Sequence, residues 1–162
     1  MSLFFYGCSG TGSQENESVA TDTTAVQSLE RDQIFEDPDV ARWAIDRAYR
    51  KLAFEERKGF FIKDKIKKQS YRVELINMPK ADFFPTGLET VYVGAWFKTL
   101  TDTDTFVVDF KLGWNAQAFD PQYKRQGTFE VLDHQIRSRN GQARYRWNRD
   151  GKYWTQELIP AS

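Results

Sequence analysis

The sequence predicts an α+β fold in which one N-terminal helix packs on a curved antiparallel sheet of about six strands. Three observations support this prediction. Apolar residues follow a clear helical period in one stretch, which begins after Asp37. The later apolar runs have the composition of strands and are separated by turn-forming residues. In the last third, Asn140-Gly141 and Asp150-Gly151 are strong signals for two-residue hairpin turns.

The helix has well-defined start and stop signals. Asp37 is a suitable N-cap, Pro38 suits the first helical position, and Asp39 lies in the first turn, where the helix dipole favours a negative charge. Gly59 is the expected stop. The residues expected to face the sheet recur at helical spacing and are Val40, Trp43, Ala44, Ala48 and Leu52.

The strands before the last third are expected over four ranges. Residues 71–78 form one strand, which Pro79 ends. Residues 89–99 and 105–114 form a hairpin around the polar turn of residues 101–104, and a further strand covers residues 128–139. We therefore expect consecutive antiparallel strands after the helix.

The two glycine turns predict a three-stranded meander over residues 129–139, 142–149 and 152–159. Two-residue loops fix the register, which places Ile136 opposite Tyr145, His134 opposite Trp147, and Trp147 opposite Trp154. One face of the meander is therefore apolar. The other face carries a basic surface formed by Arg137, Arg139, Arg144 and Arg146.

The N-terminus differs in composition from the rest of the chain. Residues 3–8 are an apolar run that ends in Gly7-Cys8, and Ser9 follows. This pattern resembles the end of a bacterial lipoprotein signal peptide. The resemblance implies that residues 1–8 are a signal remnant, that Cys8 is lipidated, and that the protein is anchored to a membrane of the bacterial cell envelope, facing the periplasm or the exterior. The alternative is an apolar strand that buries a free Cys8.

The next segment, residues 9–36, is polar and acidic. Residues 1–40 contain eight acidic residues against Arg31 alone. Such a segment cannot bury enough apolar surface to offset the entropy of ordering, so we interpret it as a tether. A single α+β domain is expected over residues 37–162, since a chain of 162 residues suits one domain.

The charge composition excludes some classes of protein. Lys and Arg number 23, as do Asp and Glu, so the formal net charge is zero. This excludes the strong positive field of a general nucleic-acid binder. The basic segment Lys63–Lys68 and the arginine face could still contact an anionic partner, although a solvated face is the simpler interpretation.

Catalytic and metal-binding motifs are scarce. One Cys and one His exclude an internal disulfide and leave almost no material for a Cys/His zinc site, so we expect no metal and no cofactor. His134 is expected on the core face, donating a hydrogen bond to a backbone carbonyl. Asp109 interrupts an apolar run, which indicates either an ion pair with Lys111 or a carboxylate in a cleft. The candidate lining of a pocket is Asp109, Trp96, Trp114 and Phe119.

The order of elements over residues 37–159, one helix and then antiparallel strands, resembles that of the cystatin-like and NTF2-like folds. The resemblance implies a helix lying in the concave side of the sheet. We expect a non-enzymatic module that binds a small ligand or a protein. The alternatives are a small NTF2-like enzyme that uses Asp109 with His134 or a tyrosine, and a structural subunit that forms homo-oligomers.

Overall fold

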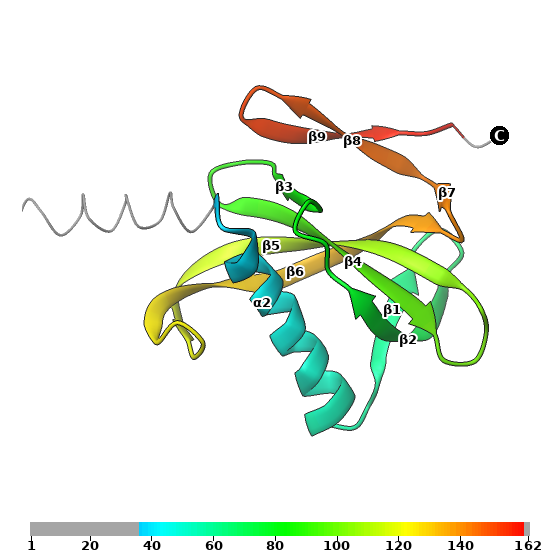
Figure 1. Ribbon diagram of the computed structural model, residues 1–162, viewed down its shortest axis with the longest axis horizontal. Helices are drawn as coiled ribbons and strands as arrows, with labels where there is room; N and C mark the ends of the chain where they lie inside the picture. Colours follow the sequence, from blue (N-terminus) through cyan, green and yellow to red (C-terminus); the bar gives the residue numbers. More distant parts are fainter. Residues whose placement is uncertain (1–35, 161–162) are drawn as a thin grey trace, which may run out of the picture.

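The computed structural model describes residues 36–160 and has one helix followed by antiparallel strands (Figure 1). The expected α+β class is confirmed. A π-helical segment, η1, directly continues the helix α2. The elements are α2 (Pro38–Arg50), η1 (Lys51–Glu55), β1 (Phe60–Asp64), β2 (Gln69–Asn77), β3 (Phe83–Pro85), β4 (Thr90–Thr99), β5 (Thr105–Asp120), β6 (Arg125–Arg139), β7 (Gln142–Ala143), β8 (Tyr145–Asp150) and β9 (Tyr153–Leu158).

Seven strands form one central sheet in the order β1-β2-β4-β5-β6-β7, with β3 paired to β4, and every pairing is antiparallel. The β8–β9 hairpin is a separate two-stranded sheet. Figure 1 shows α2 and the β8–β9 hairpin on either side of the central sheet. The domain therefore has three layers, with the central sheet in the middle.

The helix begins as the sequence predicts. The Asp37 carboxylate accepts a hydrogen bond from the Asp39 backbone N–H at 2.9 Å, and Pro38 occupies the first turn. The regular helix ends at Arg50 and the π-helical segment at Glu55, a few residues before Gly59. The residues buried against the sheet are Val40, Ala41, Ala44, Ile45 and Tyr49.

The core lies between α2 and the central sheet. Alternate residues of β4 face the helix and are fully buried, and their partners on β5 are buried with them. These β4 residues are Val91, Val93, Ala95 and Phe97. The intervening positions, which include Gly94 and its partner Asp109, face the β8–β9 hairpin.

The predicted meander is wrong beyond its first turn. β6 and β7 pair in the expected register, Ser138 with Ala143 and Arg139 with Gln142, and the pairing ends after one more backbone hydrogen bond, from Arg144 N–H to the Arg137 carbonyl at 2.8 Å. β8 pairs only with β9, so Tyr145 does not lie opposite Ile136, nor Trp147 opposite His134. The chain diverges at Arg144, and distant side-chain bonds from Arg144, Tyr145 and Trp147 hold β8 away from β6.

The second turn is present with a shifted register. The loop is Gly151-Lys152 rather than Asp150-Gly151, so Trp147 lies opposite Gln156 and Trp154 opposite Arg149. Gly151 has φ 58°, which suits the first position of a type II′ turn. The shift is two residues, so Trp147 and Trp154 still share one face, and both rings pack on Phe84.

Candidate ligand-binding site

Asp109 is fully buried between β5 and the β8–β9 hairpin. Its Oδ2 accepts hydrogen bonds from the Tyr145 hydroxyl and from Trp147 Nε1, each at 2.8 Å. Arg137 Nη2 lies 3.3 Å from its Oδ1, and the same guanidinium binds Asp82 through both terminal nitrogens. The carboxylate therefore joins the hairpin to the central sheet.

Burial raises the pKa of Asp109, and the adjacent Arg137 opposes that rise. The pKa of Tyr145 is raised as well, first by burial and then by the nearby Asp109 carboxylate. Tyr145 therefore keeps its proton and donates it in a hydrogen bond to the Asp109 carboxylate. Neither of the two cavities described below includes Asp109 in its lining.

His134 lies on the opposite face of the central sheet from Asp109. Its ring packs against Phe110, the residue next to Asp109 on β5, with ring centroids 6.0 Å apart. Its Nε2 accepts a hydrogen bond from the Lys63 backbone N–H at 3.0 Å, where the sequence led us to expect donation to a carbonyl. Burial lowers the pKa of His134, which favours this neutral acceptor. The structure does not bring Asp109 and His134 together.

The three aromatic residues expected to line a pocket with Asp109 are dispersed. Trp96 is on the Asp109 face, 44% exposed, and donates from Nε1 to Asp82 at 3.2 Å. Trp114 packs edge-on against Phe129, and Phe119 is 57% exposed further along β5. The pocket that these residues were expected to form is therefore not assembled.

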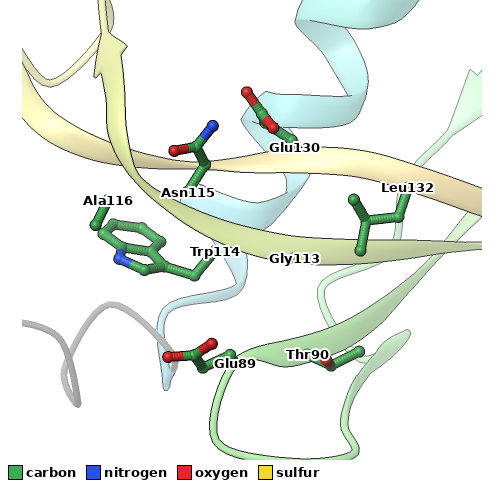
Figure 2. A pocket seen from close by; sticks show the side chains of 8 residues that line it. All are labelled: Glu89, Thr90, Gly113, Trp114, Asn115, Ala116, Glu130 and Leu132. Carbon is green, nitrogen blue, oxygen red and sulfur yellow. The ribbon is translucent and has the colours of Figure 1, made fainter.

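Trp114 instead borders a small hollow of about 400 Å³ over β4, β5 and β6. Figure 2 shows Glu89, in the loop just before β4, and Glu130, on β6, at the border of this hollow. The other lining residues are Thr90, Gly113, Trp114, Asn115, Ala116 and Leu132. Its only charged side chains are acidic.

The four arginines of the expected basic surface do not form one free cationic face, because each has an acidic partner. Their nearest contacts are Arg137 with Asp82 at 2.8 Å, Arg139 with Asp104, Arg144 with Asp64 at 2.6 Å, and Arg146 with Glu157 at 2.7 Å. Arg137 lies under the hairpin and Arg146 lies on it. Arg139 and Arg144 reach a second, larger cavity.

This larger cavity has a volume of about 890 Å³ and lies between the β1–β2 turn, the β6–β7 hairpin and the end of β9. Its basic lining residues are Lys63, Lys65, Lys67, Arg139 and Arg144, accompanied by His134. Its other lining residues are Ile66, Gln135, Ile136, Gln142, Ala143, Tyr145, Leu158, Ile159 and Pro160. The lining contains five cations and no carboxylate.

Asp64 fixes one wall of the larger cavity. Its Oδ1 accepts the backbone N–H groups of Ile66 at 3.0 Å and Lys67 at 3.1 Å, which shapes the β1–β2 turn. Its two oxygens also bind the Arg144 guanidinium at 3.0 and 2.6 Å. Arg144 lowers the pKa of Asp64 to about 2. The turn is thus held to the chain just before β8.

The lysines of this wall differ in their partners. Lys65 Nζ binds Asp133 at 2.6 Å. Within the described residues 36–160, Lys63 and Lys67 form no ion pair, and Lys67 acts on the nearby Asp104 carboxyl only as a charge that lowers its pKa. These two ammonium groups give the cavity an excess of positive charge.

The basic segment Lys63–Lys68 is visible in the sequence, but the cavity that it borders is not. The sequence does not predict β1. The cavity forms only because the fold brings the β1–β2 turn close to β6 and to the end of β9. The Asp64–Arg144 pair spans 80 residues, and no local pattern marks such a pair. A local signal did exist, since Phe60, Phe61 and Ile62 form a short apolar run of residues that favour strands.

Comparison of this chain with protein families, curated proteins and solved structures finds no match. In the part of the chain that the structure describes, no group of three or more His, Cys, Asp or Glu side chains could hold a metal ion. None of the helices within residues 36–160 is long and apolar enough to cross a membrane. Cys8 and its candidate lipidation lie outside the described residues.

Proposed function

We propose that this domain is a non-enzymatic binding module that holds an anionic ligand in the larger cavity. The observation that carries this proposal is the lining, which has five basic side chains and no acidic one in a chain of zero net charge. A volume of about 890 Å³ suits a small molecule.

The partners of Asp109 and His134 support a binding role over the enzymatic alternative. Asp109 is fully buried and accepts from Tyr145 and Trp147, while the Nε2 of His134 accepts from the backbone. A general base needs access to a substrate proton, and a pair of such groups needs to share one site. Asp109 and His134 face opposite sides of the sheet.

We propose a cystatin-like or NTF2-like arrangement for the domain and a lipid anchor at Cys8. The element order supports the first, and the apolar run before Cys8 and the acidic tether support the second. Labelling with a radioactive fatty acid in the native host, with Cys8→Ala as the control, tests the anchor. Label that persists in the Cys8→Ala protein, or its absence from both proteins, contradicts it.

Amide chemical-shift mapping by NMR tests the anion site, with inorganic phosphate, citrate and dodecyl phosphate as probes. We expect at least one probe to shift amides of the β1–β2 turn, β6–β7 and the end of β9. The double variant Lys63→Gln/Lys67→Gln removes two exposed cations and should weaken binding about tenfold. The matched control is Lys51→Gln/Lys152→Gln, which removes two exposed cations elsewhere.

The control variant should bind each probe as the unaltered protein does. Shifts that are scattered over the surface, or equal weakening by both double variants, would show that the anions respond to overall charge. Either result would contradict a specific site at the cavity.

A further inference from the structure

The larger cavity has a cationic wall and an apolar wall, and from this polarity we infer that its ligand is a single-chain amphiphile with a carboxylate or phosphate head group. This inference rests on the proposed function and adds the chemical class of the ligand. The head group is held by the lysines of the β1–β2 turn. The alkyl chain lies against the residues at the end of β9.

The cationic wall comes from one short segment. Lys63, Lys65 and Lys67 alternate along the end of β1 and the following turn, and Lys63 and Lys67 have no ion pair within the described residues. A carboxylate or phosphate is the group that the ammonium groups of lysines lining one cavity bind best. The Asp64–Arg144 pair holds this wall in place before any ligand binds.

The wall at the end of β9 is made of uncharged residues. It is formed by Leu158, Ile159 and Pro160. Ile136 and Tyr145 complete the apolar lining, and each of these two residues is 5% exposed. Leu158 is 80% exposed in the protein alone. An alkyl chain lying here would remove that surface from water, which is favourable, whereas a purely hydrophilic anion would leave it exposed.

The shape favours one molecule over a membrane surface. Side walls from the β1–β2 turn, the β6–β7 hairpin and the end of β9 border an open cavity of about 890 Å³, within the usual range of about 300–1,000 Å³ for small-molecule sites. A flat bilayer cannot reach buried Ile136 and Tyr145. The ligand is therefore taken up as a monomer.

Isothermal titration below the critical micelle concentration tests the inference, with octyl, decyl and dodecyl phosphate and with dodecanoate. Each added methylene should raise the affinity about threefold to fourfold, because it buries apolar surface. Dodecanoate and dodecyl phosphate should both bind. Dodecyltrimethylammonium, which has the same chain and a cationic head, should bind at least tenfold more weakly.

Two variants test the cationic wall and the apolar wall of the cavity separately. Lys63→Gln/Lys67→Gln should weaken dodecyl phosphate about tenfold and leave the gain per methylene unchanged. Leu158→Ser should reduce the affinity for dodecyl phosphate several-fold and leave that for inorganic phosphate unchanged. The matched control is Leu88→Ser, since Leu88 is 72% exposed and lies outside the cavity lining.

The outcomes separate this inference from the proposed function. Equal affinity for inorganic phosphate and dodecyl phosphate, with loss in the lysine variant, would overturn the amphiphile and leave the anion site standing. Binding to anionic phospholipid vesicles with no uptake of monomers would assign the surface to a membrane and overturn the inference. If no anion binds and the lysine variant changes nothing, both proposals fail.

Discussion

Three aspartates of this domain are fully buried: Asp64, Asp109 and Asp120. Each accepts hydrogen bonds that either connect distant segments of the chain or stabilise a turn. Asp64 holds the β1–β2 turn to Arg144. Asp109 holds the β8–β9 hairpin to β5. Asp120 accepts two backbone N–H groups in the β5–β6 turn and the Thr128 hydroxyl. Buried carboxylates are stable only when such donors replace water.

Asp109→Ala should lower the free energy of unfolding by about 3 kcal/mol or more, because it leaves the Tyr145 hydroxyl and Trp147 Nε1 without their acceptor and removes the carboxylate beside Arg137. Urea denaturation measures the loss. Asp109→Asn keeps a carbonyl acceptor of the same size and should cost less. Asp102→Ala, at an exposed hairpin tip, is the control and should change stability by less than about 0.5 kcal/mol. Equal stability of all these variants would contradict the role of Asp109.

Acid should weaken the fold through Asp64. Its pKa falls from 3.8 in the unfolded chain to about 2 in the folded one, so the unfolded state binds its proton first as the pH drops. The resulting stability, about 2 kcal/mol, is present above about pH 4 and is lost as the pH falls toward 2. Urea denaturation at pH 5 and pH 2.5 measures it.

The control for the acid effect is Asp64→Asn, which cannot titrate. Between pH 5 and pH 2.5 this variant should lose less stability than the unaltered protein. A parallel loss in the two proteins would show that other carboxylates account for the acid sensitivity.

His134 should titrate below its ordinary pKa of 6.5, since burial disfavours its charge and protonation removes the acceptor for the Lys63 N–H. Its contribution to stability is present above pH 6.5 and is lost as the pH falls below that value. The chain has one histidine, so an NMR titration of the imidazole reads it directly. A midpoint above 6.5 would contradict the burial and the hydrogen bond.

At the scale of elements, the β8–β9 hairpin is the part whose position the sequence does not reveal. Its central contact is Trp147, which stacks on Phe84 with ring centroids 4.8 Å apart, packs near Tyr92 and donates to Asp109. A two-stranded hairpin is marginal alone. Its order therefore depends on these contacts.

Trp147→Ala should cost about 3–5 kcal/mol of stability and should expose the amides of β8 and β9 to hydrogen exchange before those of the central sheet. Trp96→Ala is the control, since Trp96 is 44% exposed on the same face, and it should cost less than half as much. Hairpin amides that stay protected in Trp147→Ala would show that another contact holds the hairpin.

Gly151→Ala tests the observed turn. Gly151 has φ 58° and open space around it, so an added Cβ meets no atom but strains the backbone by about 1 kcal/mol. Gly87→Ala also meets no atom, at a negative or extended φ, and should be neutral within about 0.5 kcal/mol. The free energies of unfolding of the two variants measure the difference, and equal values would contradict the turn.

Sequence reasoning was most accurate where the cause is local. Asp37 and Pro38 start the helix, and Asn140-Gly141 sets the first turn, because caps and tight turns depend on adjacent residues. It was wrong where distant partners compete with the local pattern. Arg144 leaves the meander to bind Asp64, a contact between residues 80 apart that no periodicity encodes. The larger cavity depends on that divergence and could not be predicted.

At the scale of the whole molecule, zero net charge conceals a separation of charge. Most of the acidic excess lies in residues 1–40, while the larger cavity has only basic charged groups in its lining. The small hollow beside Trp114 has the opposite character, with Glu89 and Glu130 (Figure 2). A ligand with an anionic head is therefore expected at one of these two sites and excluded from the other.

The most direct measurement is the structure of the complex with dodecyl phosphate. The account predicts the phosphate within hydrogen-bonding distance of Lys63 or Lys67, and the alkyl chain against Ile136, Tyr145 and Leu158, with the Asp64–Arg144 pair intact. Dodecyl phosphate bound beside Trp114, or anywhere outside the larger cavity, would contradict the central claim.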